Sequence, residues 1–379
     1  MFEYQKTNRF FAQVAGGLEQ LGAEELAAIN AQSIQPAIRG IYFESDRATL
    51  YRINYTSRYL TRILAPLTSF TCYDTDLLYK VAKEINWTDI FSVDHTFAIF
   101  VNIAHSKITH SQYAALRLKD AIVDYFRENF GKRPSIEKIN PDVWINLHIE
   151  NDEATISLDT SGGSLHRRGY RKITVEAPMQ ETVAAAIIRY TEWSGGKPIC
   201  DPMCGSGTLL SEALMAYCNI PAGYLRKKFG FEFLPDFDKL IWQSVKQEVD
   251  QQIRQLPNEL ISGSDISAKA IEAARANCRN LPSGEKIKLT VTDFQKIQNL
   301  NDMTIVCNPP YGIRLGDKKN LDSFYKSLGD FLKKRCQGST AFIYFGNREM
   351  LKYIGLKPSW KKPLENGGLD GRLAKFEIY

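Results

Sequence analysis

From about Lys172 onward, the sequence alternates short apolar runs with longer stretches whose apolar residues recur at helical spacing. The short runs predict strands and the longer stretches predict helices, and such repeated alternation is typical of an α/β fold with a mostly parallel sheet and helices on both faces. In this architecture ligands bind at the carboxyl ends of the strands. The residues expected at those ends are Asp201, Asp265, Asp293 and Asn308.

The first half of the chain has a less regular pattern, which predicts two smaller α+β units. In the first unit, residues 10–14, 38–43 and 58–64 predict strands, and residues 18–29 and 46–54 predict helices. The second is predicted from helices at 76–85 and 111–130, a strand at 97–103 and a hairpin at 144–158. Gly162-Gly163 ends this pattern, so we predict three domains: residues 1–64, 65–162 and 163–379.

The composition excludes several classes of protein. The chain has 379 residues, of which 44% are hydrophobic and 24% charged, and no run of eighteen uncharged apolar residues predicts a membrane span. Its first residues lack the basic and apolar regions of a secretory signal. Seven scattered cysteines favour free thiols in a reducing compartment. We therefore expect a cytoplasmic protein with no membrane partner.

The positive charge is concentrated in the second half. Through Tyr170 the chain has 18 Lys and Arg against 20 Asp and Glu, whereas the remainder has 30 against 23. The excess falls in short runs, at Arg167-Arg168 with Arg171-Lys172, at Arg226-Lys227-Lys228 and at Lys361-Lys362. Such runs can bind phosphates, although a solvated loop or helix end has the same composition.

Residues 201–208, Asp-Pro-Met-Cys-Gly-Ser-Gly-Thr, predict a strand end, a glycine turn and a helix start. Glycines permit positive φ and close approach to a ligand, and a helix start offers free N–H groups. The dinucleotide fingerprint of dehydrogenases fails because Leu210 stands where its third glycine is required. Asp201 suits a positively charged ligand end instead, although a tight turn without a ligand is the plain alternative.

Two further acids follow predicted strands. Asp265 stands where a carboxylate can accept hydrogen bonds from ribose hydroxyls, and Asp293, followed by Phe294, could pair with an adenine amino group beside an aromatic ring. Either acid could equally cap a helix or a turn. Asp265 lies far beyond the spacing of one strand–helix–strand unit from Asp201, so we expect a largely helical insertion at residues 215–256.

The most specific motif is Asn-Pro-Pro-Tyr-Gly at residues 308–312. Its two prolines fix the backbone and remove two N–H donors. The Asn308 amide oxygen and the Pro309 carbonyl are left as acceptors, with an aromatic ring beside them. This arrangement suits a planar amine. The alternative is a rigid turn that only caps the strand, but such a turn does not require so specific a sequence.

These four segments together resemble class I S-adenosylmethionine-dependent methyltransferases that act on exocyclic amines of bases, over about residues 172–379. Residues 165–171 (Leu-His-Arg-Arg-Gly-Tyr-Arg), followed by 177–182 (Ala-Pro-Met-Gln-Glu-Thr), resemble the segment leading into the catalytic domain of THUMP-domain RNA methyltransferases. Residues 365–373 are similar to their terminal hairpin. The nearest resemblance is to the guanine-N2 methyltransferases of 23S rRNA, the RlmL-like group, and it implies a ferredoxin-like module and a THUMP domain upstream.

The resemblance implies a role for each site residue. The catalytic residues would be Asn308, Pro309, Pro310 and Tyr311, with Tyr311 stacking on the target base. S-adenosylmethionine would be bound by Asp201, Pro202, Cys204, Gly205, Ser206, Gly207, Thr208, Asp265, Ile266, Asp293, Phe294, Glu181 and Thr182. RNA phosphates would be bound by Arg167, Arg168, Arg171, Arg226 and Lys227.

The expected reaction is attack of a guanine amine on the sulfonium methyl group, with Asn308 as a positioned acceptor, because an amide cannot act as a base. No metal is expected, since the cysteines and histidines lack the spacing of a metal site. The alternatives are a tRNA guanine-N2 methyltransferase, a DNA amine methyltransferase, and a non-catalytic RNA-binding assembly factor.

Overall fold

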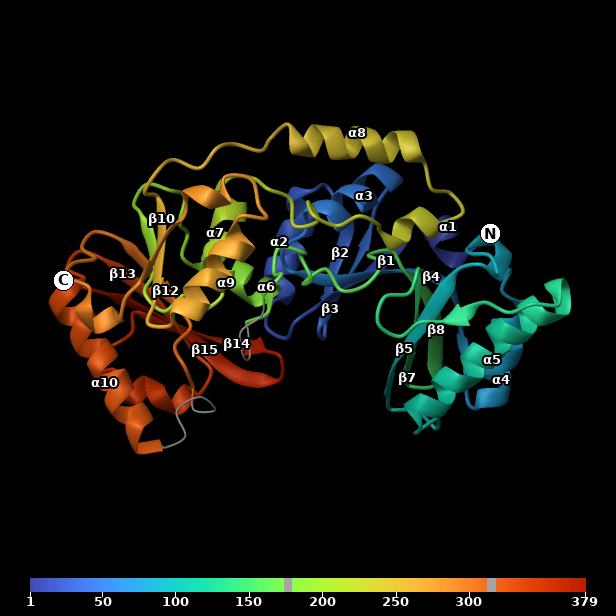
Figure 1. Cartoon of the computed structure of the whole chain (residues 1–379). Coiled ribbons are helices and arrows are strands. Elements are labelled where there is room, and N and C mark those ends of the chain that lie inside the picture. Colours follow the sequence, from blue (N-terminus) through green and yellow to red (C-terminus); the bar gives the residue numbers. More distant parts are fainter. Residues whose placement is uncertain (174–178, 312–317) are drawn as a thin grey trace. The chain divides into compact units, whose positions relative to one another are not determined.

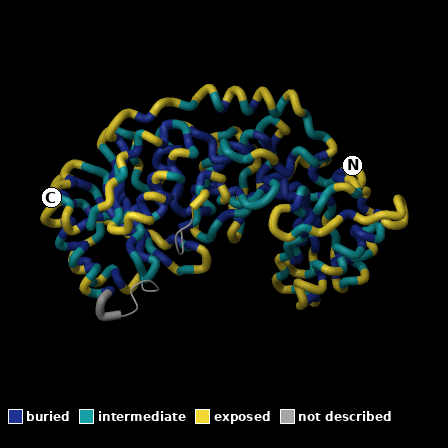
Figure 2. The backbone as a smooth tube through the Cα atoms, viewed as in Figure 1, coloured by how far each residue is buried: buried dark blue, intermediate teal, exposed yellow. Residues whose placement is uncertain are grey.

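The computed structural model of the chain describes residues 1–173, 179–311 and 318–379. Its contacts define two compact units. Unit 1 comprises Met1–Val14, Gly22–Leu165 and Arg226–Lys246, and unit 2 comprises Ala15–Leu21, His166–Leu225 and Gln247–Tyr379. Each unit contains its own sheet and its own buried interior (Figures 1 and 2).

Unit 1 is built on an eight-stranded sheet in the order β2-β3-β1-β4-β8-β7-β5-β6. Strand β4 joins the two halves of this sheet, because its first residues pair with β1 and its later residues pair with β8. The strands are β1 (Arg9–Val14), β2 (Gln32–Ala37), β3 (Gly40–Glu44), β4 (Leu60–Thr71), β5 (Thr96–Ala104), β6 (Ser135–Ile136), β7 (Val143–Glu150) and β8 (Glu153–Asp159). The helices in this part of the chain are α1 (Glu3–Thr7), α2 (Glu19–Ala28), α3 (Arg47–Thr56), α4 (Thr75–Glu84), η1 (Trp87–Asp89) and α5 (Ser111–Phe130).

The sequence pattern predicts the type of most of these elements. Helix α5 has the predicted bounds, buries one apolar face and ends at Gly131, whose φ is 65°. The predicted hairpin of β7 and β8 turns at Asn151 and Asp152, which both have positive φ. Strand β2 was not predicted, because its exposed residues do not alternate between apolar and polar.

Unit 2 contains a seven-stranded sheet in the order β11-β10-β9-β12-β13-β15-β14. The first five strands in this order are parallel, whereas β15 is antiparallel to both β13 and β14. This confirms the predicted mostly parallel sheet. The strands are β9 (Ile199–Asp201), β10 (Ile261–Asp265), β11 (Lys288–Val291), β12 (Thr304–Cys307), β13 (Thr340–Phe345), β14 (Trp360–Asn366) and β15 (Leu369–Glu377). The helices are α6 (Glu181–Tyr190), α7 (Thr208–Tyr217), α9 (Ala268–Cys278), η3 (Gly284–Lys286), η4 (Phe294–Lys296), α10 (Lys318–Arg335) and η5 (Arg348–Lys352).

The connection order reverses at β9, because β10 and β11 extend the sheet on one side and β12 and β13 on the other. Such a reversal leaves a crevice at the carboxyl ends of the central strands. Around it the sheet is fixed by buried side chains such as Ile305, Leu328 and Ile343. Among the helices that the structure describes, none is long and apolar enough to cross a membrane.

The predicted insertion after α7 is helical only in part. It contains η2 (Gly230–Phe233) and α8 (Lys239–Asp250), and its residues Arg226–Lys246 belong to unit 1. Aromatic rings fix it there: Phe231 stacks on Tyr51 of α3 with ring centroids 4.5 Å apart, and Trp242 meets Tyr55 edge-on at 5.3 Å. The aromatic residues of this segment therefore complete the core of unit 1.

Candidate active site

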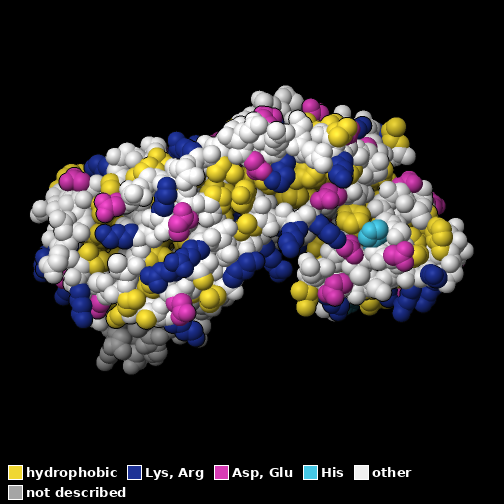
Figure 3. Space-filling view, turned by 45° about the horizontal axis from the view of Figure 1, so that its top comes forward, with side chains coloured by type: hydrophobic (Ala, Val, Ile, Leu, Met, Phe, Trp, Pro, Cys, Tyr) yellow, Lys and Arg dark blue, Asp and Glu magenta, His cyan; other side chains and the backbone are white. Residues whose placement is uncertain are grey.

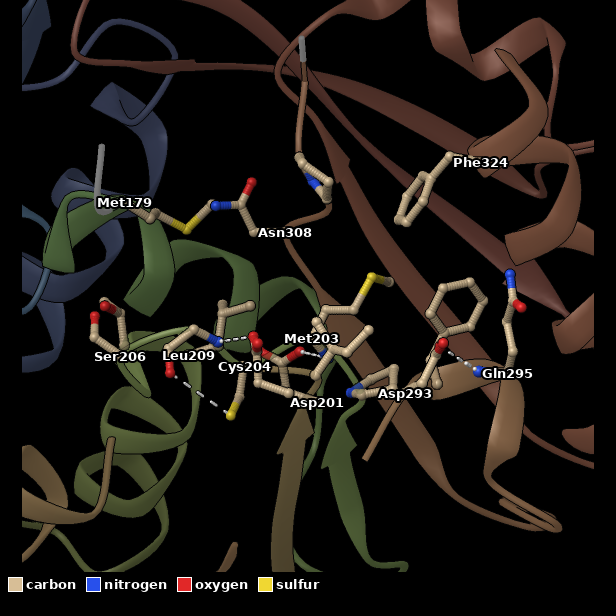
Figure 4. Close-up of a pocket in the computed structure, with 17 residues that line it drawn as sticks. Met179, Asp201, Met203, Cys204, Ser206, Leu209, Asp293, Gln295, Asn308 and Phe324 are labelled. Atoms are coloured by element: carbon tan, nitrogen blue, oxygen red, sulfur yellow. Dashed lines mark hydrogen bonds between the residues drawn. The ribbon is translucent and has the colours of Figure 1, made fainter. Parts of the chain in front are cut away.

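A cavity of about 390 Å³ lies in unit 2, lined by residues that follow β9, β10, β11 and β12 (Figure 4). In the view of Figure 4, Asn308 and Phe324 lie across the cavity from Asp201 and Cys204. The predicted site residues that line it are Asp201, Pro202, Cys204, Gly205, Ser206, Thr208, Asp265, Ile266, Asp293, Phe294, Asn308 and Pro310. Gly207, Glu181, Thr182, Pro309 and Tyr311 were also predicted as site residues and are not among its lining residues.

The glycine turn between β9 and α7 has two glycines with positive φ, Gly205 at 52° and Gly207 at 81°. A Cβ atom at Gly205 would meet no atom within 4 Å, so this glycine leaves space in the cavity. A Cβ at Gly207 would lie 3.2 Å from the Cβ of Ala274, so this glycine lets the turn pack closely on α9. One glycine therefore leaves room for a ligand and the other positions the start of α7.

Asp201 and Asp265 hold the turn through backbone hydrogen bonds. Asp201 accepts from the N–H of Met203 at 3.0 Å, and Asp265 accepts from the N–H groups of Gly205 at 3.0 Å and Ser267 at 2.9 Å. Burial, with a smaller contribution from the Asp265 carboxylate, raises the pKa of Asp201 to about 8. Asp201 is therefore largely protonated at neutral pH until a positive ligand group faces it.

This raised pKa predicts a pH dependence of donor binding. In the role that the sequence predicts for it, an ionised Asp201 would attract the ammonium group of S-adenosylhomocysteine, whereas a protonated Asp201 would not. Because the pKa of Asp201 lies near 8, we expect the affinity to fall by up to about tenfold per pH unit as the pH is lowered from 8 to 6. Calorimetry should show this slope in the wild type and not in Asp201→Asn. A wild-type affinity independent of pH would show that Asp201 does not face the ammonium group.

The other end of the cavity is apolar and aromatic. Phe294 is buried, and its ring meets that of Phe324 at 5.6 Å in an edge-on arrangement. Ile266 lines the same cavity although it is 72% exposed, and an apolar side chain in a cavity with two aromatic rings suits a purine. Asp293 accepts from the N–H of Gln295 at 3.0 Å, which fixes its carboxylate beside this wall.

Asn308 follows β12 and lines the cavity. Its Oδ1 atom is buried, and no residue that the structure describes donates a hydrogen bond to it. The Pro310 carbonyl accepts from the hydroxyl of Tyr325 at 3.3 Å. The Tyr311 ring lies against Gly346, where an added Cβ would meet ring carbons at 2.6 Å. Gly312, the last residue of this motif, lies outside the described residues, as do Ala177 and Pro178.

The structure contradicts one member of the predicted RNA contact set, Arg168. The side chain of Arg168 is fully buried, with its Nε 3.6 Å from Glu212 Oε1. Arg171 is directed inward and binds Met179 and Thr208. Arg226 donates to backbone carbonyls of residues 161–164 within unit 1. Arg171 and Arg226 are half-buried, and Arg167 and Lys227 are the exposed members of the predicted set.

Some lining residues were missed by the sequence analysis. Met203 lies in the glycine turn and Gln295 follows Phe294, so their neighbours could have suggested them. Phe324 of α10 has no local signal, because only the fold brings this helix to the cavity. The remaining missed residues are Met179 and Leu209.

The cysteines and potential metal ligands are dispersed. All seven cysteines are free and buried, and burial raises the pKa of Cys204 and Cys307 well above the usual thiol value. In residues 1–173, 179–311 and 318–379, no three His, Cys, Asp or Glu side chains gather in a way that could hold a metal ion.

Comparison with known proteins covers nearly the whole chain. The chain is 39% identical over 374 residues to slr0064, a candidate RNA methyltransferase of Synechocystis sp., with 98% of this chain and 97% of the relative covered. It is 39% identical over 383 residues to ribosomal RNA large subunit methyltransferase K/L of Syntrophotalea carbinolica, of which it spans 53%, about half. The crystal structure of SMU.472, a candidate methyltransferase complexed with S-adenosylhomocysteine, matches with a TM-score of 0.83, 29% identity and 98% coverage of both chains.

The sheet order, the glycine turn and the cavity at the strand ends define a class I methyltransferase that uses S-adenosylmethionine. Residues 168–375 match the RMKL-like methyltransferase domain, residues 72–159 a THUMP domain and residues 9–64 the RlmL ferredoxin-like domain. The chain therefore belongs to the RMKL-like methyltransferase family. The predicted boundaries at residues 64 and 162 stay predictions, and the first falls inside β4.

Proposed function

We propose that this protein transfers the methyl group of S-adenosylmethionine to the exocyclic N2 amine of a guanine in RNA, with 23S rRNA as the preferred substrate. The proposal is supported by the match to a THUMP domain and by the names of relatives that act on the RNA of the large ribosomal subunit. A protein that modifies ribosomal RNA works where ribosomes are made, so we place it in the cytoplasm.

The observation that carries this proposal is the buried Oδ1 atom of Asn308, which no described residue satisfies. A buried acceptor without a partner is costly, and it suits a donor that arrives with the substrate. An exocyclic amine has two N–H groups, so it can donate to Asn308 Oδ1 and to the Pro309 carbonyl together. Tyr311 would stack on the base.

When bound, S-adenosylmethionine supplies an electrophilic methyl group. The protein's own contribution is to hold the reactants and exclude water. Asp201, the glycine turn and Thr208 would hold the methionine end, Asp265 the ribose, and Asp293 with Phe294 the adenine. Asn308 and Pro309 would orient the amine so that its lone pair leaves the conjugation of the ring. The target guanine must leave its RNA stack before it can reach this position.

The test is transfer of labelled methyl groups to deproteinised 23S rRNA and to tRNA, followed by digestion and identification of the methylated nucleoside. We expect N2-methylguanosine in 23S rRNA. Label in tRNA alone would favour the tRNA methyltransferase alternative. Binding of both donor and RNA without any transfer would favour an assembly factor.

RNA binding should depend on few phosphate contacts. On the face shown in Figure 3, Lys and Arg side chains are interspersed with acidic ones. Arg167 and Lys227 are exposed members of the basic runs, so each change to alanine should lower the salt slope of RNA binding by about 1. The measurement is the affinity for an rRNA fragment at several salt concentrations, with the exposed Lys6→Ala as the matched control. Slopes equal to the control would exclude both contacts.

A further inference from the structure

Arg171 connects two segments that line the cavity, although it does not line the cavity itself. One of its terminal nitrogens, Nη2, donates to the carbonyl of Met179 at 2.8 Å and to Oγ1 of Thr208 at 3.1 Å. Met179 precedes α6, and Thr208 is the first residue of α7. The guanidinium group therefore fixes both walls at the end of the cavity where the glycine turn lies.

The bond to Thr208 determines how its hydroxyl can act. A threonine hydroxyl has one proton to donate and two lone pairs that accept. Arg171 has no acceptor, so it must be the donor in this bond, and Thr208 must be the acceptor. Among the described residues, none accepts the proton of the Thr208 hydroxyl. Because Thr208 is 7% exposed and lines the cavity, a ligand in the cavity is the available acceptor.

The guanidinium group of Arg171 is held in position by an ion pair with Glu181. The Glu181 carboxylate lies 3.5 Å from Nη2, and the side chains of Arg171 and Glu181 are 15% and 5% exposed. Burial raises the pKa of Glu181, whereas the charge of Arg171 opposes that rise. The positive charge of Arg171 thus stands behind the start of α7, where free N–H groups and the helix dipole already favour an anion.

We propose that Arg171 is a positioning residue for the methyl donor: it makes the Thr208 hydroxyl a hydrogen-bond donor to the α-carboxylate of the donor's methionine part. This inference rests on the proposed function, in which Thr208 binds the methionine end. It assigns recognition of that carboxylate to Thr208 and the N–H groups at the start of α7, supported by the positive charge of the half-buried Arg171.

The experiment compares two ligands by calorimetry. S-adenosylhomocysteine has the amino-acid end, whereas 5′-methylthioadenosine has the adenosine and the sulfur but no carboxylate. In Arg171→Met and in Thr208→Val, we expect the affinity for S-adenosylhomocysteine to fall about ten- to a hundredfold, since a charged hydrogen bond is lost. The affinity for 5′-methylthioadenosine should stay unchanged. The double variant should bind S-adenosylhomocysteine no more weakly than the weaker-binding single variant, because both changes remove the same interaction.

The matched control is Tyr170→Phe, which removes a buried hydrogen bond from the neighbouring residue to Glu212, outside the cavity. It should bind both ligands as the wild type does. Equal losses for both ligands in Arg171→Met would show a merely structural role and overturn the inference, as would unchanged binding of S-adenosylhomocysteine. A wild type that binds neither ligand would instead overturn the proposed function, and this inference with it.

Discussion

Replacement of Asn308 by alanine is expected to lower kcat by about 10²–10³-fold and to leave the affinity for S-adenosylmethionine unchanged. The reason is that Asn308 Oδ1 is a buried acceptor at the cavity wall with no donor among the described residues. Loss of a comparable preorganised hydrogen bond costs ~2.7–4 kcal/mol in the transition state. Single-turnover transfer to 23S rRNA, with donor affinity measured by calorimetry in parallel, separates the two effects.

Two controls sharpen this prediction. Asn308→Asp keeps an acceptor and should retain more activity than the alanine variant. Ionisation of the new carboxyl group is disfavoured by the acidic residues at the neighbouring strand ends. Thermal unfolding should show no loss of stability in Asn308→Ala, because the change removes an unsatisfied buried atom. Transfer by the alanine variant at nearly the wild-type rate would show that Asn308 only ends a strand.

Replacement of Arg168 by methionine is expected to lower the free energy of unfolding by about 3–5 kcal/mol. Arg168 and Glu212 form a pair in which both side chains are 0% exposed. Without the guanidinium group, the Glu212 carboxylate stays buried with the Tyr170 hydroxyl, 3.0 Å away, as its donor. Urea unfolding followed by fluorescence measures the loss.

The neighbouring Arg167 provides the matched control, because it is exposed. Arg167→Met should change the free energy of unfolding by at most about 0.5 kcal/mol. The double variant Arg168→Met with Glu212→Leu should recover most of the stability, since it removes both buried charges. If Arg168→Met were no less stable than Arg167→Met, the buried pair would contribute little.

Local patterns predicted the elements that are periodic or buried on both faces. Strand β12 is a continuous apolar run, as expected for a central parallel strand, and helix α5 has a regular apolar face. Strand β4 was predicted too short, because Pro66 lies at an irregularity in its pairing with β8 and its outer half is partly exposed. No local sequence pattern identifies a strand that pairs with one half of a sheet at its start and with the other half at its end.

The candidate site was predictable where its residues are consecutive, as in the glycine turn and at Asn308. It was not predictable where the fold joins distant segments. Arg168 belongs to a basic run. The sequence cannot show that it is buried in an ion pair with Glu212, which lies on a helix 44 positions later. The same holds for Phe324, which only the packing of α10 brings beside Phe294.

The aromatic segment at Arg226–Lys246 also sets the order in which the protein can mature during its synthesis. Unit 1 contains residues up to Leu165 and then this segment, so its core around Tyr51 and Tyr55 is incomplete until Trp242 has been made. At roughly 5–20 residues per second, the about 80 residues between Leu165 and Lys246 take roughly 4–16 s. During that interval the nascent chain exposes an unfinished apolar surface. A ribosome that stalls there therefore leaves a fragment in need of a chaperone.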